Sequence, residues 1–99
     1  MNRNMMRQYQ RQLAQLQKIQ EELETLTVEG TAGGGVVKVV MTGKQAVEAV
    51  EIDPEAAEEI ELLQDLMVAA FNDASTKAQE LAASKMSVIT GGMNIPGLT

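Results

Sequence analysis

The sequence contains no cysteine and no histidine, and Tyr9 and Phe71 are its only aromatic residues. Without cysteine and histidine the chain lacks thiol chemistry, disulfides, the usual transition-metal ligands and the commonest general base. With so few rings it also lacks a stacking platform for the bases of single-stranded nucleic acid. We therefore predict a protein that is not an enzyme, with no metal, no cofactor and no small-molecule substrate.

The sequence also lacks a long hydrophobic run. No stretch approaches the ~18 apolar residues of a membrane span, and the N-terminus has no signal-peptide core. We expect a soluble, cytoplasmic protein without a membrane partner. A domain of this size buries only somewhat more than about 60% of its unfolded surface, so self-association is expected.

Acidic and basic residues are unevenly distributed along the chain, whose net charge is −6. Residues 1–20 hold four bases and no acid, whereas residues 48–65 hold eight acids and no base. Such asymmetry is typical of a surface for nucleic acid, or for an acidic protein, on an otherwise acidic body.

Hydrophobic spacing predicts an α+β subunit with the order α-β-β-β-α, in one domain over residues 1–90. We expect a helix over 2–26, a three-stranded antiparallel sheet over 27–53 and a helix over 55–88, which Asp53-Pro54 would start. Gly91-Gly92 ends the second helix, and residues 91–99 are predicted to be a flexible tail. A central strand over 36–42 that is apolar on both faces should be covered on both, which again indicates a dimer. The predicted core or dimer contacts are Leu13, Leu16, Leu23, Val37, Val39, Leu63, Met67 and Phe71.

Four cations of the first helix form a basic stripe: Arg3, Arg7, Arg11 and Lys18. At ~100° per residue they fall within roughly 80° of one another, opposite an apolar seam at heptad spacing. Their mutual repulsion and the positive end of the helix dipole both oppose this arrangement. A surface for a polyanion explains it, since arginine suits phosphate, but a merely solvated helix face fits the pattern equally well.

Several segments, in order along nearly the whole chain, resemble the bacterial YbaB/EbfC family of nucleoid-associated proteins. They are residues 17–23 (QKIQEEL), 33–39 (GGGVVKV), 41–43 (MTG), 50–54 (VEIDP), 66–74 (LMVAAFNDA), 85–86 (KM) and 90–93 (TGGM). The combination carries the resemblance rather than any single piece.

The resemblance implies a tweezer-like homodimer whose protruding helical arms embrace double-stranded DNA with little sequence specificity. It also implies a nucleoid-associated role in organising the nucleoid and in gene regulation. Carried over to this chain, the DNA-facing residues are Arg3, Arg7, Arg11 and Lys18, with Lys77 and Lys85 on the second helix. The second helix has fewer bases than the family pattern, which places more of the contact on the first helix. The alternative is a protein-interaction module that uses the helical seam and the acidic segment.

Overall fold

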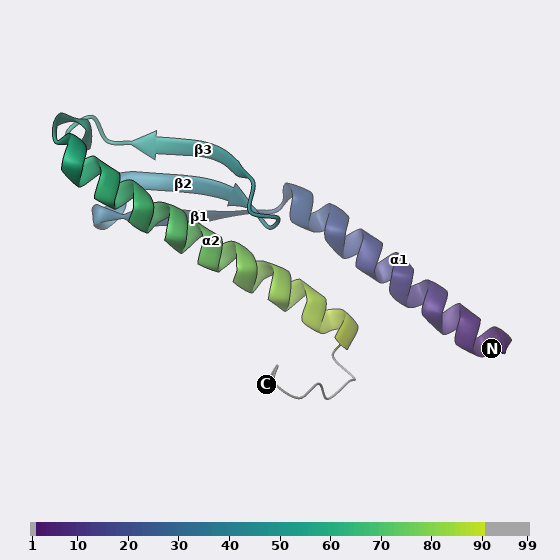
Figure 1. Ribbon diagram of the computed structural model, residues 1–99. Helices are drawn as coiled ribbons and strands as arrows, with labels where there is room; N and C mark the ends of the chain where they lie inside the picture. The colour runs from purple at the N-terminus through teal and green to yellow at the C-terminus, as the bar shows by residue number, and fades with distance from the viewer. Residues whose placement is uncertain (1, 91–99) are drawn as a thin grey trace.

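The computed structural model describes residues 2–90 and arranges them as two helices and a three-stranded sheet (Figure 1). The main elements are α1 (Arg3–Thr25), β1 (Thr27–Ala32), β2 (Val37–Thr42), β3 (Val47–Ile52) and α2 (Ile60–Thr90), with short 3-10 helices η1 (Gly33–Gly35) and η2 (Ala56–Glu58). The strands pair antiparallel in the order β1-β2-β3. The α+β class and the α-β-β-β-α order are thus confirmed. The tail predicted for residues 91–99 lies outside the described residues.

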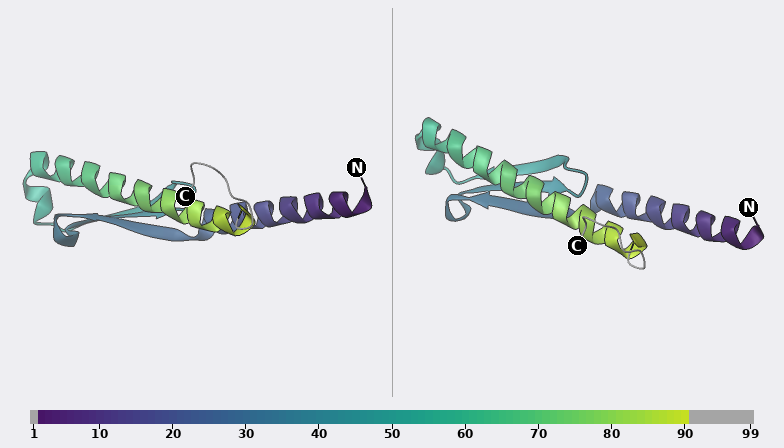
Figure 2. Two further views of the ribbon diagram at one scale, coloured as in Figure 1. Left: turned by 90° about the horizontal axis from the view of Figure 1, so that it is seen from below. Right: turned by 60° about the horizontal axis from the view of Figure 1, so that its bottom comes forward.

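The molecule is elongated, with extents of 66 × 26 × 15 Å, because α1 projects beyond the sheet (Figures 1 and 2). Asn2 caps this helix, since its Oδ1 accepts the backbone N–H of Met5 at 2.8 Å. Every residue from 2 to 15 is exposed, and α1 becomes buried only at Ile19 and Leu23. We call residues 3–15 the arm. Within residues 2–90, neither helix combines the length and the apolar character that a membrane crossing requires.

One face of the sheet packs against α2 through small and β-branched side chains. The completely buried residues of this contact are Val37, Val39, Ala70, Ala74 and Ala78. The alanines recur every four residues, so they share one face of α2. Gly30 of β1 completes the contact, because a Cβ there would lie 2.3 Å from both the carbonyl oxygen of Ala70 and the backbone nitrogen of Ala74. The helix can lie this close only because these positions carry almost no side chain.

The predicted core residues divide into buried and exposed ones. Leu23 is buried like Val37 and Val39, and Leu63, Met67 and Phe71 are half-buried against the core. Along the seam of α1, Leu16 is half-buried and Leu13 is 47% exposed. For Leu13, the prediction of a dimer contact therefore stays a prediction.

The central strand β2 is covered by α2 on one face only. Val37, Val39 and Met41 point into the core, whereas Lys38 and Val40 on the other face are half-buried. We predicted that both faces of this strand are covered, and within a single chain only one of them is.

The second helix begins five residues later than predicted. Instead of capping a helix at residue 55, the Oδ1 atom of Asp53 accepts the N–H of Glu55 at 3.0 Å in a local turn. The carbonyl of Asp53 accepts the N–H of Ala56, which is buried and starts η2. Glu59 then has extended backbone angles, so α2 starts at Ile60 and runs to Thr90. The chain uses residues 53–59 to turn from the sheet onto its covered face.

Candidate nucleic-acid interface

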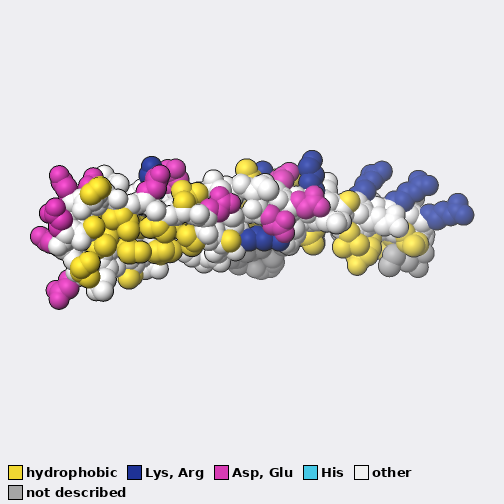
Figure 3. Space-filling model, turned by 90° about the horizontal axis from the view of Figure 1, so that it is seen from above, with side chains coloured by type: hydrophobic (Ala, Val, Ile, Leu, Met, Phe, Trp, Pro, Cys, Tyr) yellow, Lys and Arg dark blue, Asp and Glu magenta, His cyan; other side chains and the backbone are white. Residues whose placement is uncertain are grey.

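The basic stripe lies on one side of the projecting helix α1. Arg3, Arg7 and Arg11 occupy successive turns of the arm, and Lys18 follows where α1 reaches α2; all four residues are exposed. Figure 3 shows dark blue side chains projecting from one side of the arm and hydrophobic side chains from the opposite side. The amphipathic pattern of the sequence is therefore preserved in space, with cations and seam facing apart.

The eight cations of the chain fall into two groups according to their partners. Four lysines form ion pairs with carboxylates: Lys38 with Glu29 and Glu51 (both 3.9 Å), Lys44 with Glu24 (3.1 Å), Lys77 with Asp73 (3.1 Å) and Lys85 with Glu22 (3.3 Å). The other four are the members of the basic stripe, and none of them lies within 4.0 Å of a carboxylate oxygen of residues 2–90. The cations without a carboxylate partner in the described part of the chain are thus gathered on one helix face.

Lys77, predicted to face DNA, lies at the edge of β1 instead of beside the stripe. Its Nζ atom donates to the carbonyl of Glu29 at 2.9 Å, and Asp73, one turn earlier, accepts the backbone N–H of Thr31 at 3.0 Å. Both the Thr31 N–H, which has the larger effect, and the Lys77 ammonium favour the ionised carboxylate of Asp73. They lower the pKa of Asp73 below its ordinary value. The ion pair therefore satisfies backbone groups of an edge strand, a structural task that the sequence pattern did not indicate.

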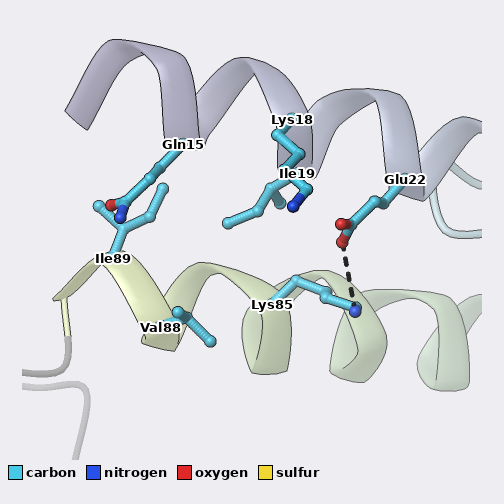
Figure 4. A pocket seen from close by; sticks show the side chains of 7 residues that line it. All are labelled: Gln15, Lys18, Ile19, Glu22, Lys85, Val88 and Ile89. Carbon is cyan, nitrogen blue, oxygen red and sulfur yellow. Dashed lines mark ion pairs between the residues drawn. The ribbon is translucent and has the colours of Figure 1, made fainter. Parts of the chain in front are cut away.

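Lys85 lies beside Lys18, in a cleft of about 300 Å³ between the two helices. Figure 4 shows Lys18, Ile19 and Glu22 of α1 facing the last turns of α2. The ion pair between Lys85 and Glu22 spans the cleft at 3.3 Å. Of the two predicted second-helix contacts, Lys85 thus adjoins the inner end of the stripe and Lys77 does not.

The structure also exposes an apolar face that the sequence pattern did not indicate. α2 packs on β1 and β2 and leaves the same face of β3 open. The hydrogen bond from Gln45, just before β3, to Ser75 shows which side of α2 borders this strand. The exposed residues along β3 and the start of α2 are Val47, Val50, Ile52, Ile60 and Val68, beside half-buried Met67 and Phe71. We call these seven residues the β3–α2 face, and a hydrophobic patch gathers at the end of the molecule opposite the arm in Figure 3.

The acidic residues gather near this apolar face and away from the arm. Carboxylates from β3 to the start of α2 surround the end of the molecule that is opposite the cations (Figure 3). Among residues 2–90, no group of three or more acidic side chains has the geometry to hold a metal ion. These carboxylates give this end of the molecule a negative charge, opposite in sign to that of the arm.

Comparison with protein families and known proteins finds relatives along nearly the whole chain. The model of the YbaB/EbfC DNA-binding family matches residues 1–93. A nucleoid-associated protein of Dictyoglomus turgidum is 50% identical over 93 residues, which cover 92% of this chain and 89% of that protein. Another, of Desulforamulus reducens, is 52% identical over 96 residues, with 95% and 91% covered.

A solved structure shares the fold. The crystal structure of an uncharacterised protein from Helicobacter pylori superimposes with a TM-score of 0.75 and 18% sequence identity, covering 95% of this chain and 99% of that one. At this identity the likeness concerns the arrangement of helices and strands alone.

Proposed function

The chain belongs to the YbaB/EbfC DNA-binding family, and on that premise we propose that it is a nucleoid-associated protein that binds duplex DNA as a homodimer. In this proposal the basic stripe of α1 is the principal contact surface, and the protein acts in the nucleoid by organising DNA and influencing gene expression. The family is a DNA-binding one and carries no catalytic assignment.

Among residues 2–90, the cations of the stripe have no ion-pair partner, and this observation carries the proposal. Elsewhere in the described chain each lysine is neutralised by a carboxylate, yet Arg3, Arg7 and Arg11 have none. Like charges at i, i+4 spacing and at a helix N-terminus each cost a few tenths of a kcal/mol. Phosphates placed along this face would relieve both penalties and accept the forked donors of arginine.

Duplex DNA fits the arm better than single-stranded nucleic acid. Tyr9 is the only ring on α1 and belongs to the seam, on the opposite side from the stripe, so no ring stacks with bases where the cations bind. Contacts from arginines on a smooth helix face address phosphates rather than base edges. Weak sequence preference follows from this chemistry.

The DNA proposal is tested by fluorescence anisotropy with a duplex at low salt. The Arg7→Gln/Arg11→Gln variant removes two unpaired cations, and the matched control, Lys38→Gln/Lys44→Gln, removes two paired ones. We expect the arm variant to lose about tenfold or more in affinity, since each lost phosphate contact removes counterion release, and the control to lose much less. Equal losses in the two variants would show that net charge, rather than the stripe, governs binding.

We also propose that the β3–α2 face is where two subunits meet. Val50, Ile52 and Ile60 are 37%, 38% and 61% exposed in the single chain, which is unusual for clustered large apolar residues of a small domain. The free edge of β1 is blocked by the side chains of Asp73 and Lys77, so the β3 side of the sheet is the open one. A second copy would cover this face and leave both arms free.

The dimer is tested by sedimentation of Val50→Glu beside the neighbouring control Ala49→Glu. Residues 49 and 50 point to opposite faces of β3, so both variants add one negative charge but only the first enters the proposed interface. We expect Val50→Glu to sediment as a folded monomer and Ala49→Glu as a dimer. A dimer that persists in Val50→Glu, or a wild-type monomer, contradicts the proposed face.

A further inference from the structure

The seam of the arm is an apolar surface that no described part of the chain covers. Met6, Tyr9 and Leu13 are 48%, 57% and 47% exposed, and Met5 beside them is 56% exposed. Large apolar side chains along one side of a projecting helix are costly to leave in water. The other helix does not relieve this cost, because the last turns of α2 reach α1 on the side of the basic stripe (Figure 4). The seam is therefore open along the arm.

The spacing of the seam is typical of a helix that packs against one other helix. Met6, Tyr9, Leu13 and Leu16 are separated by three, four and three residues, which is the alternation of positions a and d in a coiled coil. A helix that covers a sheet or a broad core usually carries a wider apolar face. The seam therefore fits a second helix better than a flat surface.

The residues that flank the seam indicate which helix this is. Positions e and g, on the two sides of the seam, select the partner of a coiled coil through their charges. Apart from Arg3 near the N-terminus, the polar residues at these positions in the first half of α1 are exposed and uncharged: Gln10, Gln12 and Gln17. They provide no charge to attract a different helix and none to repel an identical one. The charge pattern therefore favours a second copy of the same arm.

We propose that the seam is an interface between copies of the chain, in which two arms pair antiparallel as a short coiled coil. Tyr9 of one arm then packs against Leu13 of the other, and Met6 packs against Leu16, in layers related by a twofold axis. Residues 1–20 contain no acid, so the antiparallel direction keeps the two acidic bodies apart. Each stripe lies opposite its own seam, so both stripes face outward and stay accessible to phosphate.

The small size of this interface sets its strength. A few side chains from each arm cannot bury the ~1,200 Å² that is typical of a stable interface. Arm pairing therefore requires a higher protein concentration than pairing through the β3–α2 face. Copies held close together on one duplex gain effective concentration, which promotes the contact. Only this last step depends on the proposed DNA binding.

Because the sequence contains no cysteine, single-cysteine variants can test the contact by cross-linking. In an antiparallel pair the two copies of Gln10 lie on the same side of the pair and close together, whereas Gln8 points away from it. We expect a short bismaleimide to join Gln10→Cys chains several-fold more than the matched control, Gln8→Cys. In the Gln10→Cys background, Tyr9→Gln/Leu13→Gln should lower the yield to that of the control, whereas Gln8→Ala/Ala14→Gln, outside the seam, should leave it unchanged.

The variants are chosen so that only the seam changes. All the substituted positions are exposed, and glutamine and alanine are good helix formers, so α1 stays helical. Equal yields from Gln10→Cys and Gln8→Cys would overturn the proposal, because they would indicate random collision. A yield that Tyr9→Gln/Leu13→Gln does not lower would overturn it as well.

Two further measurements fix the orientation of the arms and the independence of the contact. Cross-links only between Gln12→Cys and Gln17→Cys chains in a mixture would overturn the antiparallel arrangement in favour of a parallel one. The test contains no DNA, and we expect the same result in the Val50→Glu background, so its failure is distinct from failure of the proposed DNA contact or of the β3–α2 face. If the preference for position 10 disappeared in that background, the arm would not be an interface of its own.

Discussion

Gly30 lies where β1 packs directly against the backbone of α2. A methyl group there would lie 2.3 Å from two backbone atoms of α2, which cannot move without shifting the helix. We expect Gly30→Ala to reduce the free energy of unfolding by about 3 kcal/mol, at the upper end of overpacking costs. Urea titration measures this loss of unfolding free energy. The protein concentration is kept the same for both proteins, because self-association would add to the apparent stability.

Gly34 provides the control for this prediction. It has a φ of +73° and no atom within 4 Å of an added Cβ, so Gly34→Ala introduces backbone strain without a clash. We expect a loss of about 1 kcal/mol, the cost of placing an L-residue in the left-handed region. If Gly34→Ala were as damaging as Gly30→Ala, close packing would not be the reason for the glycine in β1.

Asp73 makes the stability of the fold depend on pH. Its pKa is lowered by the N–H of Thr31 and by Lys77, so the ionised form is favoured in the folded chain. This contribution is complete above the ordinary aspartate pKa and is lost as the pH falls through the lowered folded value. We expect the stability difference between wild type and Asp73→Asn to be constant near neutral pH and to shrink below about pH 4. Parallel pH profiles of the two proteins would contradict this role.

At the scale of elements, local patterns predicted what each segment would become. The heptad seam and the absence of glycine and proline predicted α1, and the glycine triplet before Val36 predicted the first hairpin turn, where all three glycines have positive φ. The start of α2 was predicted wrongly because an aspartate such as Asp53 can either cap a helix or close a turn. In the structure Asp53 closes a turn, which allows Ala56 to be buried. A single-sequence pattern contains no information on that burial.

The same limit applies to the candidate site. The stripe needed only helical geometry, so its four members could be found from spacing alone. The ion pair of Lys77 with Asp73 is an i, i+4 contact that helical spacing allows. The Glu29 carbonyl that Lys77 also contacts and the Glu22 partner of Lys85 lie far away in sequence and could not be found in this way. The β3–α2 face likewise exists because α2 lies over β1 and β2 and leaves β3 uncovered. This placement results from contacts between distant segments and not from the local pattern of either segment.

The helix pair α1–α2 offers a test of whether Lys85 contributes to DNA binding. If Glu22 holds Lys85, then Glu22→Gln frees a cation beside Lys18, and we expect affinity for duplex DNA to rise more than in the control Glu21→Gln, an adjacent exposed acid. Lys85→Ala should weaken binding less than Arg7→Ala, because in the wild type its charge is already neutralised. Anisotropy titrations at one salt concentration compare all four variants. A larger loss in Lys85→Ala than in Arg7→Ala would make α2 a main contact surface.

At the scale of the whole molecule, the basic stripe and the β3–α2 face lie at opposite ends of a 66 Å body. The cations are on the arm, and the β3–α2 face with its acidic surroundings is at the other end. Joining two subunits at the apolar end would leave both arms free and keep the acids away from DNA. The net charge of −6 is therefore compatible with DNA binding, because a polyanion experiences the local field of the arm within a Debye length of about 8 Å.

This arrangement makes a quantitative prediction for salt dependence. Four stripe cations in each of two subunits give eight, so if all contact phosphates, the logarithm of the affinity should fall with the logarithm of salt concentration with a slope of about −7. The monomer expected for Val50→Glu presents one arm, and its slope should be about half as steep, whereas Ala49→Glu should keep the full slope. Titration of a fixed duplex at four or more salt concentrations measures all three. A monomer with an undiminished slope would show that a single arm makes every phosphate contact and that dimerisation serves another purpose.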